Sequence, residues 1–290
     1  MIANLIGVGY WGSFIYKTLK DTGFKTINLC DPKVPGACTN YKKMDQAEFV
    51  FVATPVSSHF EICEHFLSQG KRVFCEKPLT ATAKEAEELY KIAEEHNTYL
   101  FVDWVFTYNY GVELIKQYVK DKENKGNPIA HAYMQRKNTR INHITDINAK
   151  LDLAGHDISV LLTLTDQIVM AVKWTEYRKD SKSPHTDSAI GNLKFGRFDA
   201  IVDVSWYNPY KARESVIKFT NDEYVIWNDA NQTVAFQDNF RDKPLTISYA
   251  AHASPLERAI KQFLILNNTS YQKQKDLTLS ILRILNNDSD

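Results

Sequence analysis

An apolar run at the start of the chain leads directly into a glycine-rich segment. This segment reads Gly7-Val8-Gly9-Tyr10-Trp11-Gly12, so its three glycines follow the G-x-G-x-x-G spacing. In such a motif the first glycine permits a tight turn and the second lets the backbone approach a pyrophosphate. The third lets the following helix pack closely on the strand, and the helix N-terminus faces the phosphates. The segment therefore predicts a β-α-β nucleotide-binding fold.

An acidic residue ends the next predicted strand. Asp31 stands nineteen positions after Gly12. An acid at this place binds a ribose 2′-hydroxyl and repels a 2′-phosphate, which favours NAD over NADP. The alternative is an Asp-Pro turn at Asp31-Pro32 without a ligand role.

The first hundred residues alternate short apolar runs with amphipathic segments, which is typical of β-α-β units and a parallel sheet. Thr82 and Glu85 have the spacing of a capping box at the start of one helix. We expect an N-terminal Rossmann domain over residues 1–107. Its predicted strands are 4–8, 26–30, 49–53, 72–75 and 99–102, and its predicted helices are 11–21, 58–69 and 83–95.

The pattern changes from about residue 108. Residues 198–206 alternate apolar and polar side chains, which predicts an antiparallel sheet with one buried side. We expect a second α/β domain, residues 108–290, with a mostly antiparallel sheet and a frayed end over residues 286–290. Its predicted strands are 129–136, 169–177, 189–195, 198–206, 215–220 and 224–227, and its predicted helices are 112–118 and 255–266.

Composition excludes some classes of protein. The 35 Lys and Arg residues balance the 35 Asp and Glu residues, so no general attraction to nucleic acid or to an anionic membrane is expected. No stretch approaches the roughly 20 apolar residues of a membrane-spanning helix. The four cysteines form no C-x-x-C pair, which fits a reducing cytoplasm.

Lys77 is a candidate catalytic residue because of its position. It lies in Glu76-Lys77-Pro78, just after a predicted strand, and ligands of open parallel sheets bind at the carboxyl ends of strands. A lysine beside a nicotinamide ring can accept a proton from an alcohol or orient it. The alternative is a solvated loop lysine.

Asp152 and His156 are four residues apart, so a helix through them places both side chains on one face. The same spacing suits half of a metal site, but no third ligand has convincing spacing and H-E-x-x-H is absent. The other alternative is a capping Asp beside a structural His. With Lys77 available, we favour a proton relay and predict no metal.

A basic and polar stretch, residues 136–143, precedes these two residues. Arg136, Asn138 and Arg140 suit an anionic group such as a pyrophosphate or a sugar carboxylate. A solvated loop is the alternative.

Together these motifs resemble the Gfo/Idh/MocA oxidoreductases, in an order that covers more than half of the chain. Ala53-Thr54-Pro55 with His59 adds to the likeness. Within the family the chain is most similar to nucleotide-sugar 3-dehydrogenases that act on UDP-N-acetylglucosamine-type uronates. That finer likeness rests on the Gly-Tyr-Trp-Gly form of the first motif and on residues 108–109, 135–138, 146–159 and 204–206.

The resemblance implies an NAD(H)-dependent dehydrogenase that transfers a hydride at a sugar CH-OH carbon, C3 in the subgroup. It also implies a large open sheet in the second domain, used to form a homodimer or homotetramer. Lys77 or His156 then accepts the hydroxyl proton, and Asp152 orients the imidazole or binds the substrate. The implied cofactor-binding residues are Gly7, Gly9, Tyr10, Trp11, Gly12, Asp31, Thr54, Pro55, His59, Glu76 and Lys77, and the implied substrate-binding residues are Arg136, Asn138, Arg140 and Asn148.

Some positions depart from the family pattern. Gly155 stands where proline is expected, Tyr110 replaces a proline, and Trp104 replaces a histidine. Lys150-Leu151 also replaces an apolar-aromatic pair. We expect these residues around the substrate, so they leave the reaction class intact and the sugar open. The alternatives are an enzyme of the same fold acting on a free sugar, a polyol or another carbonyl compound, and a non-catalytic ligand sensor.

Overall fold

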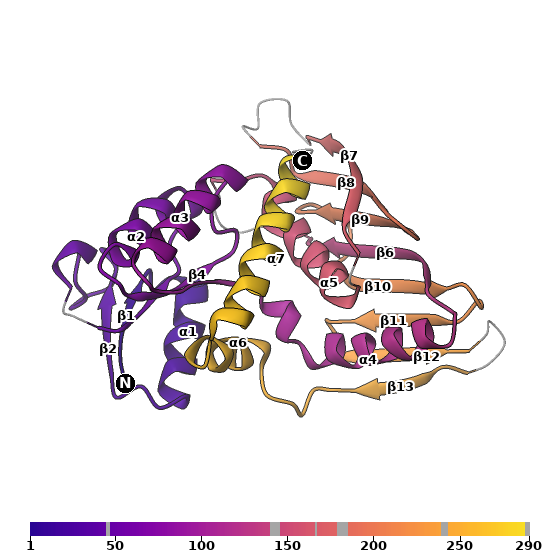
Figure 1. Ribbon diagram of the computed structural model, residues 1–290, viewed down its shortest axis with the longest axis horizontal. Helices are drawn as coiled ribbons and strands as arrows, with labels where there is room; N and C mark the ends of the chain where they lie inside the picture. Colours follow the sequence, from indigo (N-terminus) through magenta and orange to yellow (C-terminus); the bar gives the residue numbers. More distant parts are fainter. Residues whose placement is uncertain (45–46, 140–145, 166, 179–184, 239–242, 288–290) are drawn as a thin grey trace. The chain divides into compact units, whose positions relative to one another are not determined.

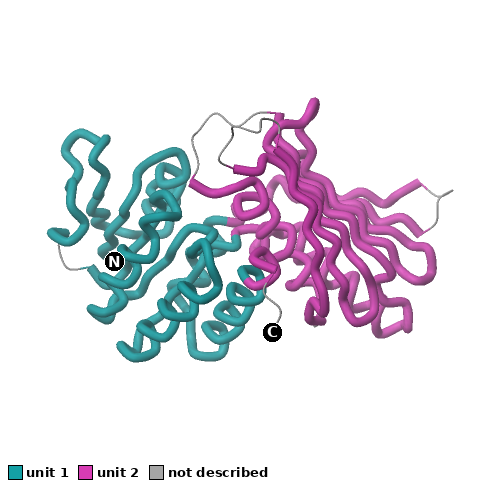
Figure 2. The backbone as a smooth tube through the Cα atoms, turned by 90° about the horizontal axis from the view of Figure 1, so that it is seen from above, with its two compact units in different colours: residues 1–104, 256–282 teal, residues 105–255, 283–290 magenta. Residues whose placement is uncertain are grey.

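The computed structural model describes residues 1–290 except 45–46, 140–145, 166, 179–184, 239–242 and 288–290. The chain forms two compact units, coloured separately in Figure 2. Unit 1 comprises residues 1–104 and 256–282, and unit 2 comprises residues 105–255 and 283–290.

Unit 1 contains a five-stranded parallel sheet with the order β2-β1-β3-β4-β5. Every residue of β3 and β5 is buried, as expected where helices cover both faces of a parallel sheet. The predicted Rossmann topology is therefore confirmed. The strands are β1 Ile2–Ile6, β2 Thr26–Cys30, β3 Phe49–Val52, β4 Arg72–Glu76 and β5 Leu100–Asp103, and the helices between them are α1 Tyr10–Asp21, α2 His59–Leu67 and α3 Ala83–Glu95.

The start of α3 is fixed by the capping box that the sequence predicts. The Thr82 hydroxyl accepts a hydrogen bond from the Glu85 N–H, and the Glu85 carboxylate accepts one from the Thr82 N–H. Two otherwise unpaired amides at the helix start are thereby satisfied.

The C-terminal segment returns to the first sheet. Phe263 of α6 (Pro255–Leu264) lies with its ring centroid 5.6 Å from those of Phe51 and Phe74, and 5.7 Å from that of Phe101. Gln274 of α7 (Asn268–Asn286) donates a hydrogen bond to the carbonyl of Val102 at 2.6 Å. Residues 256–282 thus belong to unit 1, whereas the sequence prediction placed them in a second domain, 108–290.

Unit 2 is built on an eight-stranded sheet with the order β13-β12-β11-β10-β6-β9-β8-β7 (Figure 1). The β6–β9 pair is parallel and the others are antiparallel, so the predicted mostly antiparallel sheet is confirmed. The strands are β6 Ile129–Lys137, β7 Val169–Tyr177, β8 Ser188–Phe195, β9 Asp199–Ser205, β10 Ala212–Phe219, β11 Tyr224–Asn228, β12 Thr233–Gln237 and β13 Leu245–Ser248.

The two faces of this sheet differ. Helices α4 (Tyr110–Asn124) and α5 (Gly155–Leu164) lie against one face in Figure 1. Side chains on that face are buried, such as Ala200, Val202 and Val204 of β9. The opposite face carries partly exposed side chains, which explains the alternation seen in the sequence. Among the described residues, no helix combines the length and the apolar content that crossing a membrane requires.

Candidate functional site

The glycine-rich turn has one open position and two closed ones. Gly7 has φ +86°, and a Cβ there would lie 2.4 Å from the Ala53 carbonyl oxygen. A Cβ on Gly12 would lie 2.1 Å from the Gly7 oxygen. A Cβ on Gly9 would have no neighbour within 4 Å, and Gly9 is the residue before α1. The turn is therefore close-packed except where a phosphate group would approach the helix N-terminus.

Two aromatic residues follow in the first turn of α1. Tyr10 is 82% exposed and Trp11 is half-buried. Both rings contact Phe14, with centroid distances of 5.2 and 5.8 Å. The predicted cofactor-binding pair thus forms a partly exposed aromatic cluster beside the open turn.

Asp31 links the end of β2 to the glycine-rich turn. One carboxylate oxygen accepts a hydrogen bond from the Val8 N–H at 2.8 Å, and the other accepts one from the Lys33 N–H at 2.8 Å. A carboxylate accepts up to about four hydrogen bonds. Asp31 therefore stabilises the turn and keeps acceptor capacity for a ribose hydroxyl.

His59 joins the loops after β3 and β4. The side chain is 1% exposed, with Nε2 2.8 Å from the Thr54 oxygen and Nδ1 3.0 Å from the Pro78 oxygen and 3.2 Å from the Leu79 oxygen. Carbonyl oxygens only accept hydrogen bonds, so the ring nitrogen that carries the proton donates to the carbonyl oxygen it faces. His59 thus holds the Thr54-Pro55 turn against the loop that follows Lys77.

Lys77 lies where the sequence predicts, just after β4, and is half-buried. A cis peptide bond joins it to Pro78. Glu76 before it is 9% exposed, and its register partner Asp103, which ends β5, is fully buried. The sequence reasoning missed Asp103, although an acidic residue at the end of a buried parallel strand was the available signal.

Burial raises the pKa of both acids. The pKa of Asp103 rises to about 7, an effect opposed by the adjacent Glu76 side chain and by the positive charge of Lys77. The pKa of Glu76 rises well above its ordinary value because of burial and then the charge of Asp103, with Lys77 opposing. Unit 1 therefore holds a lysine next to two buried carboxyl groups at one end of its sheet.

Unit 2 carries the other predicted acid and base. Asp152 lies in a π-helical turn, Lys150–Ala154, and His156 lies in the first turn of α5. The sequence reasoning expected one regular helix. The Asp152 carboxylate accepts a hydrogen bond from the Trp206 indole N–H at 2.9 Å, and the Asn148 side chain accepts one from the Leu151 N–H at 2.9 Å. Local π-helical turns occur frequently at functional sites.

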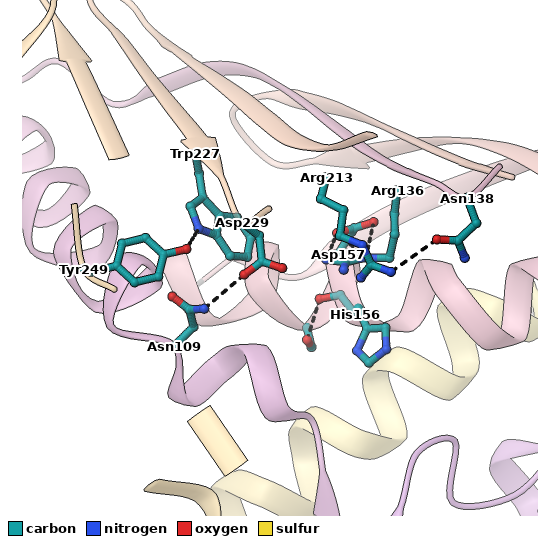
Figure 3. A network of polar contacts seen from close by, with 10 residues as sticks. Asn109, Arg136, Asn138, His156, Asp157, Arg213, Trp227, Asp229 and Tyr249 are labelled. Carbon is teal, nitrogen blue, oxygen red and sulfur yellow. Dashed lines mark hydrogen bonds and ion pairs between the residues drawn. The ribbon is translucent and has the colours of Figure 1, made fainter. Parts of the chain in front are cut away.

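The His156 ring packs edge-on against Phe106, with centroids 4.9 Å apart. The Arg136 guanidinium lies over the same Phe106 ring, 4.3 Å from its centroid. Figure 3 shows Arg136 and Asp157 side by side, with His156 close by on α5. Phe106 therefore contacts both the buried guanidinium and the His156 imidazole.

Arg136 is 2% exposed and forms a buried ion pair with Asp157, at 2.7 Å. Its guanidinium is thus held within unit 2 against α5. Arg213, which the sequence reasoning missed, stands beside Arg136 on the neighbouring strand and donates to the Asn138 side chain at 3.3 Å. Burial and the charge of Arg136 lower the pKa of Arg213. The predicted residue Arg140 lies outside the described residues.

Further polar contacts lie along the same face of the sheet as the Arg136–Asp157 pair (Figure 3). Asn109 donates to Asp229 at 3.2 Å, and the Trp227 indole donates to the Tyr249 hydroxyl at 2.7 Å. Burial raises the pKa of Asp229, opposed by the charges of Arg136 and Arg213. The face that holds His156 is therefore lined with fixed polar groups.

The positions that depart from the family pattern have structural partners. Trp104 is 1% exposed and donates to the Thr278 hydroxyl at 3.0 Å, so it belongs to the core of unit 1 rather than to a substrate site. The Tyr110 ring stacks on His252, with centroids 3.5 Å apart. Lys150 forms an ion pair with Glu176 at 2.6 Å, and Gly155 is buried at the start of α5.

No group of three or more His, Cys, Asp or Glu side chains in the described part of the chain is arranged to hold a metal ion. The site residues are titratable acids, bases and hydrogen-bond donors.

Comparison with known proteins agrees with this architecture. Residues 3–104 match a family model described as "Oxidoreductase family, NAD-binding Rossmann fold". Inositol 2-dehydrogenase of Serratia proteamaculans (strain 568) is 29% identical over 170 residues, 57% of this chain and 50% of that protein.

Two solved structures share the fold along nearly the whole chain. An oxidoreductase from Pseudomonas syringae has a TM-score of 0.83 at 16% identity, covering 99% of this chain and 95% of its own. The UDP-N-acetylglucosamine 3-dehydrogenase GnnA from Acidithiobacillus ferrooxidans has a TM-score of 0.79 at 18% identity, covering 98% and 95%. At such identities the likeness shows the fold alone.

The fold and the glycine-rich turn define a two-unit α/β protein with an NAD-binding Rossmann domain. Residues 3–104 match the model of the Gfo/Idh/MocA oxidoreductase family. The chain's matches to the curated relatives cover from 15% to 50% of their lengths.

Proposed function

We propose that this protein is an NAD-dependent dehydrogenase that transfers a hydride between a sugar CH-OH group and nicotinamide. The observation that carries the proposal is the position of Lys77. It follows the fourth strand of an NAD-binding Rossmann unit whose glycine-rich turn is open at Gly9. Ligands of such sheets bind at this end of the strands.

The residues of unit 1 fit NAD(H). The space at Gly9 and the free N–H groups at the start of α1 suit a pyrophosphate. We propose that Asp31 binds the ribose 2′-hydroxyl and thereby favours NAD over NADP. When bound, NAD supplies the hydride acceptor. Tyr10, Trp11, Thr54 and Pro55 complete the proposed cofactor contacts, and His59 and Glu76 support them from within the protein.

The protein supplies the proton chemistry. In the oxidation direction, a hydroxyl proton passes to Lys77 Nζ or to a ring nitrogen of His156. Asp152 is anchored to Trp206 and either orients the imidazole or binds the substrate. Single substitutions at Lys77 and His156 test which of them accepts the proton first. Only the loss of the proton acceptor should remove the ionisation that limits kcat on one side of its pH profile.

For the substrate we propose a nucleotide sugar, a UDP-N-acetylhexosamine or its uronate, oxidised at C3. The sequence likeness at residues 146–159 supports this choice. Asn138 and Arg213 are joined by a hydrogen bond and offer donors for an anionic group. We propose that Arg136, held by its ion pair with Asp157, supports these donors from the protein interior. Asn148 stabilises the π-helical turn that carries Asp152. Arg140 is proposed to add a positive charge for the same anionic group.

A free sugar or polyol is the second candidate, and the likeness to an inositol 2-dehydrogenase over 57% of the chain favours it. A ligand sensor that keeps the fold is the non-enzymatic alternative. Retention of Lys77, Asp152 and His156 together supports an enzyme, because a sensor needs no proton-transfer groups.

Thermal unfolding of the NADH-loaded protein tests these candidates. A ligand that binds only the folded state raises the unfolding temperature according to its concentration and affinity. We expect a selective increase with a UDP-N-acetylhexosamine or its uronate. An increase only with free sugars or polyols would support the second candidate, and no increase with any of them would support the sensor.

We also propose that the chain forms a homodimer or homotetramer in the cytoplasm through the less covered face of the unit 2 sheet. Ile201, Tyr133, Val216 and Ile226 lie in register on adjacent strands of that face and are half-buried. An apolar row across an open sheet suits pairing with a second copy. Light scattering after size exclusion tests this, and a monomer at micromolar concentration would contradict it.

A further inference from the structure

Glu76 and Asp103 place two carboxyl groups side by side in unit 1. They are register partners at the carboxyl ends of the parallel strands β4 and β5. Partners in a parallel pair project to the same face of the sheet. Asp103 is fully buried and Glu76 is 9% exposed, so little water reaches either group.

These carboxyl groups have few donors. The Trp11 indole N–H is a donor beside Glu76 and lowers its pKa. Three of their four oxygens, Glu76 Oε1 and both oxygens of Asp103, are buried without a hydrogen-bond partner. An ionised carboxylate only accepts hydrogen bonds, so two carboxylates cannot satisfy each other. A proton on one of them creates an O–H donor for the other and removes one of two buried like charges.

The charges around Glu76 and Asp103 favour a state in which the two carboxyl groups hold one proton between them. Burial raises the pKa of both acids, and the charge of Asp103 raises that of Glu76 further. Lys77 opposes both shifts and favours one remaining negative charge. The adjacent Cys75 thiol is buried with a raised pKa, so it is neutral and adds no charge.

We propose that Glu76 and Asp103 share one proton at neutral pH, and that the single negative charge left on this acid pair positions the side-chain nitrogen of Lys77. Asp103 is thus a positioning residue for Lys77. The statement about Lys77 rests on the proposed function, whereas the shared proton does not.

The sign of the pH dependence follows from the raised pKa values. In the unfolded chain both acids ionise near pH 4. Between about pH 5 and pH 7 the folded protein therefore holds one proton more than the unfolded chain. The contribution of the pair to stability is fully present below about pH 4 and is lost as pH rises through the folded pKa values, with the unfolding constant increasing about tenfold per pH unit.

Urea unfolding of the full chain at a series of pH values tests the shared proton. Glu76→Gln/Asp103→Asn should reduce the proton uptake on folding by about one. Asp21→Asn, an exposed Asp at the end of α1, is the control and should leave the pH dependence unchanged. Equal slopes for the wild type and the double variant would overturn the proposal.

Infrared difference spectra of the wild type give a second measurement that needs no variant to fold. A protonated carboxyl band should be present at pH 7 and should disappear in alkaline solution. Its absence at pH 7 would overturn the shared proton.

The positioning role has its own readout. Asp103→Asn should remove one limb from the pH profile of kcat while leaving NADH affinity within about twofold, and Asp103→Glu should restore the limb. Suppose that urea unfolding shows the expected proton uptake, but Asp103→Asn leaves the pH profile of kcat unchanged. The positioning role of Asp103 toward Lys77 would then be rejected, whereas the shared proton would not.

Discussion

Gly12 packs against the backbone of Gly7 in the first turn of the nucleotide-binding unit. A Cβ on Gly12 would lie 2.1 Å from the Gly7 carbonyl oxygen. Gly9 stands between them and would bring its Cβ within 4 Å of no other atom. Two glycines are thus required by the fold, and we propose that the third is required by a ligand.

Alanine substitutions should separate these two requirements. Gly12→Ala should reduce the free energy of unfolding by at least about 3 kcal/mol, because the contact is with backbone and cannot relax cheaply. Gly9→Ala should keep stability within about 1 kcal/mol and weaken NADH binding by at least about tenfold, or 1.4 kcal/mol. Chemical unfolding and fluorescence titration measure the two effects. Normal NADH affinity in Gly9→Ala would contradict the assignment of this turn to the pyrophosphate.

Asp31→Asn should change cofactor choice more than fold. The amide oxygen can still accept the hydrogen bond from the Val8 N–H, which the carboxylate accepts at 2.8 Å. The charge that repels a 2′-phosphate is removed, so the NADP/NAD ratio of Kd values should fall by about tenfold or more. Titration with both cofactors checks this. A ratio unchanged from the wild type would reduce Asp31 to a turn residue.

His59→Ala should destabilise the protein and loosen the loop after Lys77. The change removes the ring N–H that donates to the Thr54 or to the Pro78 carbonyl oxygen, which costs about 1–3 kcal/mol. Hydrogen exchange should increase in residues 77–80, and NADH affinity should fall as a secondary effect. His96→Ala, an exposed position at the end of α3, is the matched control. Equal exchange in both variants would argue against His59 as the link between these loops.

Breaking the Arg136–Asp157 pair should cost more than replacing it. Asp157→Asn leaves a guanidinium buried at 2% exposure without its counter-charge, which should cost about 3–5 kcal/mol. Arg136→Met/Asp157→Leu removes both charges and should recover most of that loss. Urea unfolding of the two variants checks the order. If the double variant were the less stable, charge burial would not be the main cost.

Much of unit 1 is predictable from local sequence. The observed bounds of β2 and α3 match the prediction, because alternating apolar runs and a capping box are local signals. The position of α6 is not local information. A 3.6-residue period identifies an amphipathic helix, but not the sheet that Phe263 covers.

Other elements were missed because their buried faces are partly polar or short. α7 buries Gln274 and Thr278, which a search for apolar periodicity counts as exposed. β12 buries only Val234, and β13 buries none of its four residues. Such strands carry little alternation for a sequence pattern to reveal.

The sequence predicts the candidate site as separate motifs and not as a network of contacts. Lys77, Asp152 and His156 were identified from spacing and resemblance. Asp103 was missed because its partner Glu76 lies 27 positions earlier in the chain and becomes its neighbour only through strand pairing. Arg213 was missed for the same reason, since its pairing with Arg136 follows from the register of β10 and β6.

The central claim is that Lys77 serves hydride-transfer chemistry in an NAD-dependent enzyme. The most direct measurement is kcat together with the Kd of NADH for Lys77→Met, using the substrate selected by thermal unfolding. Lys84→Met, at an exposed position of α3, is the matched control. We predict that Lys77→Met lowers kcat by at least about a hundredfold and leaves the Kd of NADH within about threefold, or 0.7 kcal/mol. Wild-type turnover in Lys77→Met, or loss of NADH binding together with turnover, would contradict the account.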